Sequence, residues 1–464
     1  MPELLFVTTV GQPQRENGAV RRQIRRQAMS KAAAKRKERG GYGQFNRLQY
    51  PASMCQPKSG ENSLKTPYWA TIPRSPSCTG YERLRIQYGV DLLDLSALTN
   101  FHVSQGTVVS LANGPSLLKH IVRSRQWSYF DYLPRYADAN PALEAASRCV
   151  AARLQEFLIH PHTPTSCGTL RLYIGALRAL QAELEDRDAC LSSETLCATQ
   201  VLGLYELLKV SNVNVWNQHS AGASALVKLR GPAHYQTDFE KSLFLSQIGQ
   251  IYHEALGEQR ACFLESPEWL PVLDSMVVEC EPFADRGAFV MTLWKTILPL
   301  PRYVGQAAAA VRGSDEDTDR AIARLRLARL LEGLHDASTA LLTEISSWDL
   351  QSYNMDAHEN DKPLEARGLL LTALAIVSRL RFALCPARPG LEGEAQVAAR
   401  KILLVNDEAI AMHPRAELYM AMKVHVAQTI LATGPSWLAG DWAGLDKVPT
   451  SALVEWFRRI GWNA

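Results

Sequence analysis

The chain has 464 residues, of which 47% are hydrophobic and 21% are charged, and its formal net charge is only +3. This composition excludes a disordered or collagen-like chain, and the length allows roughly two or three domains with sizeable cores. The longest strongly apolar run, residues 368–378, is far shorter than the ~20 residues of a membrane-spanning helix, so we expect no membrane partner. Residues 1–10 are too short for a secretory leader, and Glu3 stands where such a leader carries positive charge.

A basic segment comes first in chain order. Residues 19–39 read AVRRQIRRQAMSKAAAKRKER, which is rich in helix formers and lacks proline and glycine. The basic side chains occupy nearly every face of the expected helix: Arg21, Arg22, Arg25, Arg26, Lys31, Lys35, Arg36, Lys37 and Arg39. Like charges four residues apart repel, so we expect this helix to fray until an anionic partner neutralises it.

Three roles remain open for this segment. Its arginines and lysines are suited to DNA phosphates, and Lys35-Arg36-Lys37 is typical of a nuclear-import signal. A solvated basic tail is the simplest alternative, and an arginine-rich, acid-poor start is also found in mitochondrial presequences. We therefore assign residues 1–44 to a basic arm that serves nuclear import or DNA contact.

A linker follows the basic arm. The Gly40-Gly41-Tyr42-Gly43 run ends the expected helix, and the next stretch is dense in proline, serine and glycine. We assign residues 45–80 to this linker and residues 81–464 to a helical domain. No leucine heptad follows the basic helix, which argues against a basic-zipper arrangement.

Helical patterns dominate from residue 81 onward, and few segments alternate as a strand would. The pattern predicts an all-α, irregular helical array. Ser192 or Ser193 is a candidate cap for a helix that buries the leucines after it. One apolar stripe is expected to contain Leu170, Tyr173, Ile174, Leu177, Leu180 and Leu184. Further helices are predicted at 322–342, 369–384, 395–404, 416–431 and 454–460, with breaks at Pro299 and Pro301, at 313–319 and at 355–363.

The most informative stretch is residues 216–269, which begins WNQHSAGASALVKLRGP and closes on FLESPEW. Ala221, Ala225 and Leu229 recur at helical spacing, with Leu226 beside them, and predict a buried helix that ends at Gly231-Pro232. A second helix is expected over residues 235–256, with Trp269 as a bulky anchor after it.

This pattern resembles the regulatory domain of fungal-specific transcription factors. The resemblance implies a nuclear regulator that controls a gene set, often for a metabolic or secondary-metabolite biosynthetic pathway. It also implies an all-helical body that binds partner proteins or a small effector and commonly forms a homodimer. The expected partners are DNA, contacted directly or through another protein, and the transcription machinery. The beginning of the chain, with Phe6-Val7, Gly11, Pro13 and RRQIRRQAM, resembles family members that lack a zinc cluster.

The cysteines depart from the common pattern of that family, in which six cysteines hold a binuclear zinc cluster. Nine cysteines are scattered through this chain and never paired as CxxC, which predicts a reducing compartment and mostly buried thiols. Cys190 and Cys197 are six residues apart in between, but Arg187 stands where a CxxC partner belongs. We therefore predict no metal site, and sequence-specific binding through a zinc cluster does not carry over.

Other candidate chemistry has a structural explanation. His160, His162 and Cys167 lie in a proline-interrupted loop without a fourth ligand, and His219 is expected to be a satisfied core histidine. The acidic run 315–319 resembles the aspartate-rich motif of terpene cyclases, but residues 406–408 lack the hydroxyl ligand of a partner motif. No dinucleotide fingerprint or nucleophile elbow occurs. We expect no cofactor and no catalytic residue. The alternatives are a helical enzyme such as a diphosphate-dependent cyclase, and an interaction adaptor that does not bind DNA.

Overall fold

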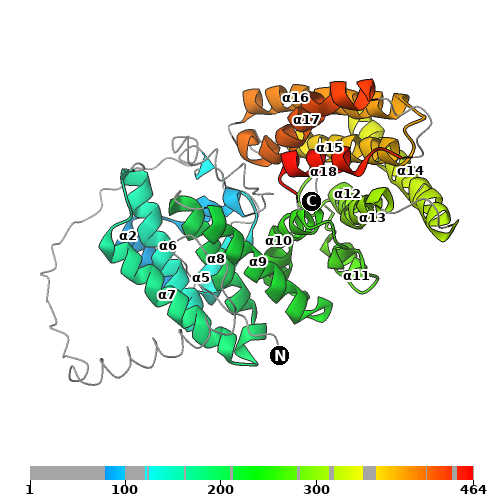
Figure 1. The fold of residues 1–464 in the computed structure, drawn as a ribbon. Coiled ribbons are helices and arrows are strands. Elements are labelled where there is room, and N and C mark those ends of the chain that lie inside the picture. Colours follow the sequence, from blue (N-terminus) through cyan, green and yellow to red (C-terminus); the bar gives the residue numbers. More distant parts are fainter. Residues whose placement is uncertain are drawn as a thin grey trace, which may run out of the picture. The chain divides into compact units, whose positions relative to one another are not determined.

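The computed structural model describes residues 79–99, 121–122, 125–160, 163–209, 213–279, 283–312, 318–348, 362–413, 415–440 and 447–462. All of them belong to one compact unit, Ser75–Ala464. Every regular element in these ranges is an α-helix or a 3₁₀-helix, which confirms the all-α prediction (Figure 1). None of the helices described is long and apolar enough to cross a membrane. The basic arm and most of the expected linker lie outside the described residues.

The first group of helices packs around α6 and α8, each of which contacts α7. Its elements are α2 (Gly80–Tyr88), η2 (Leu92–Leu98), η3 (Tyr129–Tyr132), α5 (Leu133–Tyr136), α6 (Pro141–Ile159), α7 (Cys167–Glu185), η4 (Ala189–Leu191), α8 (Ser193–Lys209) and α9 (Val213–Arg230). Side chains cap several helix starts, as expected from the need to satisfy free backbone N–H groups. Ser192 caps α8 by accepting from the Thr195 N–H at 3.1 Å, which confirms one of the two predicted caps.

Helix α10 (Asp238–Gly257) links this group to the rest of the unit, because it contacts α8 and α9 on one side and α13 on the other. Its start is fixed by a capping box, in which Thr237 and Glu240 each bind the other's backbone N–H. Gly231, with φ +73°, ends α9, because a residue with a Cβ is strained in that conformation. The elements that follow α9 up to α12 are η5 (Pro232–His234), α10, η6 (Phe263–Glu265) and α11 (Leu270–Met276).

The second group packs around α15, whose residues from Gly368 to Leu384 are almost all buried. Its elements are α12 (Ala288–Ile297), α13 (Leu300–Arg312), α14 (Thr318–Ser347), α15 (Lys362–Leu384), α16 (Gly390–Met412), α17 (Ala416–Ala439) and α18 (Thr450–Ile460). Figure 1 shows α16 and α17 along one side of α15, and α14 also contacts it. These helices contain all five segments predicted to be helical between residues 322 and 460.

One charged pair lies entirely inside the second group. Arg379 of α15 binds Glu392 of α16 through two hydrogen bonds of 3.0 and 2.6 Å, and both side chains are 0% exposed. The same guanidinium donates to Thr433 Oγ1 of α17 at 2.6 Å and lies 4.3 Å from the ring centre of Trp437. Three helices are therefore joined at one side chain.

The buried faces of two helices differ from the sequence prediction. In α9 the core side is formed by Ala223, Leu226 and Val227, so the expected burial of Leu226 is confirmed. Ala221, Ala225 and Leu229 are exposed, so the prediction is wrong for these three residues. The reason is that the core side also accommodates polar residues, because Arg230 is buried and donates to the carbonyl of Leu191.

In α7, Tyr173 and Leu180 face the core as predicted, but Leu170 and Ile174 are each 41% exposed. The breaks are close to those predicted. α12 ends at Ile297 and α13 begins at Leu300, so Pro301 already lies inside the later helix. The helix predicted at 235–256 begins three residues later, at Asp238. Trp269 is 2% exposed, which confirms its role as an anchor.

Candidate functional site

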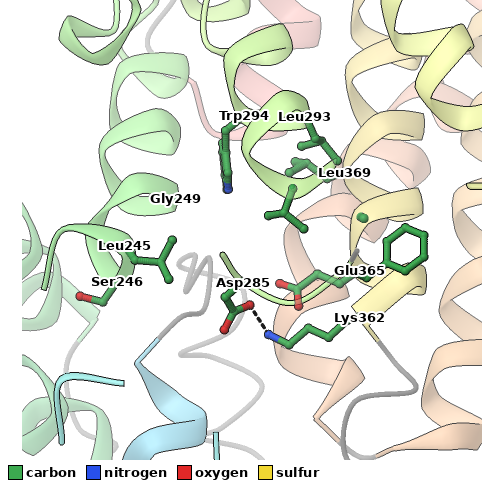
Figure 2. Close-up of a pocket in the computed structure, with 12 residues that line it drawn as sticks. Leu245, Ser246, Gly249, Asp285, Leu293, Trp294, Lys362, Glu365 and Leu369 are labelled. Carbon is green, nitrogen blue, oxygen red and sulfur yellow. Dashed lines mark hydrogen bonds and ion pairs between the residues drawn. The ribbon is translucent and has the colours of Figure 1, made fainter. Parts of the chain in front are cut away.

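A small pocket lies where α10, α12 and the start of α15 meet (Figure 2). The three helices come from distant parts of the chain, and the segment before α12 completes the wall. The lining residues are Leu245, Ser246, Gly249, Phe283, Asp285, Val290, Leu293, Trp294, Lys362, Glu365, Ala366 and Leu369. Most of these side chains are apolar, and the charged ones gather on one side.

The apolar wall consists mainly of Trp294 and Leu293 of α12 and Leu369 of α15, as Figure 2 shows. Trp294 is 6% exposed and meets the ring of Tyr252 edge-on, with the ring centres 5.8 Å apart. Such an edge-to-face contact holds the indole in one orientation. This side of the pocket is therefore a fixed apolar surface.

The polar side is built from an ion pair and a bound carboxylate. Lys362, at the first position of α15, pairs with Asp285, and their side chains are 10% and 22% exposed. One turn later, Glu365 accepts a hydrogen bond of 3.3 Å from Arg415, whose side chain is 4% exposed. A charged pair with so little water around it is screened less by salt than a surface pair. The pocket thus presents both a positive and a negative group beside its apolar wall.

The pocket volume is about 60 Å³, which is room for about four to six water molecules or a small fragment of a ligand. Ser246 is not placed to act as a nucleophile, because its one hydroxyl hydrogen is directed at the Leu243 carbonyl and Gln200 Oε1, which lie 2.8 and 3.0 Å from Oγ.

A second cavity, of about 50 Å³, lies on a neighbouring face of α10 and has a mostly polar, uncharged lining. His219 lines it and is 5% exposed. Its Nε2 lies 3.1 Å from the Tyr173 hydroxyl, whereas its Nδ1 has no hydrogen-bond partner among the described residues. Burial lowers the pKa of His219 to about 4, so the ring is neutral near pH 7. His219 is thus a core histidine as predicted, but only one of its ring nitrogens is satisfied.

The remaining residues singled out by the sequence are dispersed. His160 is the exposed C-cap of α6 and Cys167 is exposed at the start of α7, whereas His162 lies outside the described residues. Three of the six described cysteines are buried, namely Cys149, Cys197 and Cys262, so the thiols are less uniformly buried than predicted. Within the described ranges no three His, Cys, Asp or Glu side chains are grouped to hold a metal ion.

The acidic segments do not line either cavity. Asp319 is exposed near the start of α14, and residues 315–317 lie outside the described ranges. Asp407 and Glu408 are exposed on the outer side of α16. The nine basic residues of the arm also lie outside the described part of the chain, so their roles stay predictions.

Sequence analysis missed the residues that line the pocket. Asp285 and Lys362 are 77 positions apart, and neither lies in a recognisable motif. The only local signal is Lys362-Pro363, since proline is favoured in the first turn of a helix and places the lysine at its start. Their pairing depends on tertiary packing alone.

The fold and the cavities define a helical binding scaffold, and the comparisons assign it to a family. The family model described as fungal specific transcription factor domain matches residues 121–408. The chain therefore belongs to the fungal-specific transcription factor domain family, whose members are transcription regulators. The matched residues include the whole first pocket and most of the second.

One curated relative is the uncharacterized protein AN5342 of Emericella nidulans, which is 33% identical over 125 residues. The similar region covers 27% of this chain and 26% of the relative, so the chain matches about a quarter of that protein's length. No solved structure matches the chain.

Proposed function

We propose that this protein is a nuclear regulator that controls transcription of a metabolic or secondary-metabolite biosynthetic gene set. The observation that carries the proposal is the family match over residues 121–408, which covers most of the helical unit. The basic segment supports it, because clustered arginines and lysines suit both nuclear import and contact with DNA phosphates.

The proposed division of labour places attraction to DNA in residues 1–44. Some charges of the described helical unit are paired with each other, as in Arg379–Glu392. Arg21, Arg22, Arg25 and Arg26, by contrast, repeat on adjacent turns of the expected arm. Contacts to phosphates release counterions, so the affinity for DNA should fall steeply as salt is added. In a plot of the logarithm of the binding constant against the logarithm of the salt concentration, each neutralised phosphate contributes about −0.9 to the slope.

Chromatin immunoprecipitation of the full chain tests the regulatory role, with enrichment at a defined set of promoters as the expected result. Changing Arg21, Arg22, Arg25 and Arg26 to glutamate should abolish both the enrichment and DNA binding in a salt titration. A matched control carries the same change at four exposed arginines of the helical unit: Arg171, Arg178, Arg187 and Arg388. If both variants lose DNA binding equally, the arm has no special role in that binding. If the protein is absent from nuclei and no promoter is enriched, the proposal is overturned.

The pocket at α10, α12 and α15 is proposed to hold a small effector with an apolar body and a polar end. Trp294 and Leu369 offer the apolar wall, and the Lys362–Asp285 pair offers charge of both signs. Titration calorimetry with metabolites of the regulated pathway tests this. Lys362→Met should weaken binding, whereas Lys295→Met should not, because Lys295 pairs with Asp274 away from the pocket. Equal affinity in both variants would count against the pocket.

An interaction adaptor is the second candidate. It is favoured by the absence of any CxxC pair in the sequence, since the zinc cluster common in this family needs closely spaced cysteines. An adaptor would reach promoters only with a DNA-binding partner. Purified protein that fails to shift any DNA, together with promoter enrichment in cells, would favour this candidate.

A further inference from the structure

The outer face of α16 carries a charge pattern that is complementary to itself. Three side chains seven residues apart form its centre: Val397, Leu404 and Ala411. Val397 is 47% exposed and Leu404 is 68% exposed, which is unusual for large apolar residues of a helix whose main neighbours, α15 and α17, lie on its other side (Figure 1). Seven residues are close to two helical turns, so the three side chains lie along one line.

Two pairs of opposite charge flank this line. Arg400 and Lys401 precede Leu404, and Asp407 and Glu408 follow it, and all four are exposed. None of them forms an ion pair with a described residue, although Arg400 donates to Gln396 at 3.4 Å. They cannot pair along the helix, because side chains meet at spacings of three or four residues and these charges are seven apart.

We propose that this face of α16 binds the same face of a second copy of the chain, with the two helices antiparallel. A two-fold axis through Leu404 places each Leu404 against its counterpart and each Val397 near the other copy's Ala411. On one flank Arg400 then meets Asp407 of the second copy, and on the other flank Lys401 meets Glu408. All four cross-pairs are attractive. An isologous interface of this kind needs a patch that is complementary to itself.

The charges also fix the direction of the pair. In a parallel arrangement the residues at equal height face each other, so Arg400 and Lys401 would meet their own kind, as would Asp407 and Glu408. Like charges across an interface are unfavourable, which leaves the antiparallel arrangement. This pattern also provides a role for the carboxylates of Asp407 and Glu408, which do not line a cavity.

The contact is small. Residues 397–411 span about 21 Å of helix, and one helix pair of that length buries less than the ~1,200 Å² of a standard stable interface. We therefore expect a concentration-dependent dimer with a dissociation constant of the order of 1–100 μM.

Sedimentation velocity of the full-length protein over a concentration series tests the interface through charge exchange. Arg400→Glu/Lys401→Glu and Asp407→Lys/Glu408→Lys should each weaken self-association by at least about tenfold, because every cross-pair becomes repulsive. An equimolar mixture of these two variants should associate, because every cross-pair between them is attractive. The variant with all four changes should dimerise by itself, and it keeps the net charge of the unchanged protein, which controls for overall charge.

A disulfide crosslink supplies the geometric test. Leu404→Cys lies on the proposed two-fold axis, so oxidation should link position 404 to position 404 of another copy, as identified by mass spectrometry of the digested product. The unchanged protein remaining monomeric at about 100 μM would overturn the proposal. So would dimers that survive in both charge variants, or a four-residue variant that fails to associate while retaining its helical circular dichroism spectrum.

Discussion

Removing the carboxylate of Glu392 is the sharpest test of how the second group of helices is stabilised. Glu392 and Arg379 are both fully buried, and the Arg379 guanidinium also donates to Thr433 Oγ1 and to the Ile430 carbonyl, at 2.6 and 3.2 Å. Burial lowers the pKa of Arg379, and Glu392 opposes this effect by stabilising the charged form. Without Glu392, the positive charge stays buried with neutral partners only.

The expected cost of Glu392→Ala is about 3–5 kcal/mol in the free energy of unfolding, the range found when one partner of a buried pair is removed. Typical domains are stable by only about 5–15 kcal/mol, so this loss is between about a fifth and all of the free energy of unfolding. Arg379→Met should cost a similar amount, because it leaves Glu392 as the uncompensated charge. The double variant Arg379→Met/Glu392→Leu has no buried charge at this site, and its stability should therefore lie much closer to that of the unchanged protein than the summed losses of the single variants predict.

Urea unfolding followed by circular dichroism measures all three variants, with the midpoint and the slope compared at constant protein concentration. Glu455→Ala is the matched control, because Glu455 pairs with Arg458 at an exposed position of α18 and should leave the midpoint almost unchanged. Additive losses in the double variant would refute the reasoning, because they would mean that each side chain contributes independently of the other's charge. A loss below about 1 kcal/mol in Glu392→Ala would refute it as well, since water would then have to solvate Arg379.

Three further perturbations address the core. Trp269→Ala should lower the free energy of unfolding by about 3–5 kcal/mol in a urea titration. Leu229→Ala, at an exposed position, is the control. A smaller loss in Trp269→Ala than in this control would contradict the role of Trp269 as an anchor. Burial lowers the pKa of Lys423 to about 8, whereas the pKa of a lysine in the unfolded chain is about 10.5. The unfolded chain therefore binds more protons between these pH values, and the free energy of unfolding rises with pH there. Lys423→Met should remove that rise and increase the free energy of unfolding by about 3 kcal/mol at pH 7. Burial lowers the pKa of His219 to about 4, so stability should fall as the pH falls from about 6.5 to 4. In thermal melts, the melting temperature of His219→Gln should depend less on pH over this range. An unchanged pH dependence would mean that another group is responsible.

The sequence predicted the helices well where apolar residues are dense. In α15 the run 368–384 is buried on all sides, so the prediction did not depend on choosing a face. In α9 the prediction required choosing which face is buried. That choice was partly wrong, because the alanines and serines of α9 differ little in hydrophobicity. The buried face is decided by Arg230, which reaches the Leu191 carbonyl and lies 5.5 Å from the Tyr235 ring centre, and no local pattern reveals those partners.

The candidate pocket could not be predicted from the sequence for a related reason. Asp285 and Lys362 are ordinary surface residue types, and only the packing of α12 against α15 brings them together. The charges of α16 are different, since the spacing of Arg400, Lys401, Asp407 and Glu408 is visible in the sequence. The sequence does not show that these four side chains are exposed. That exposure distinguishes a surface that can bind another molecule from a contact inside the protein.

Helix α10 forms a wall of both cavities, and Ser246 belongs to each of them. Leu245 and Gly249 face the apolar space and Gln247 and Gln250 face the polar one, so the two directions are roughly 150° apart around the helix axis. Any displacement of α10 therefore changes the walls of both cavities together.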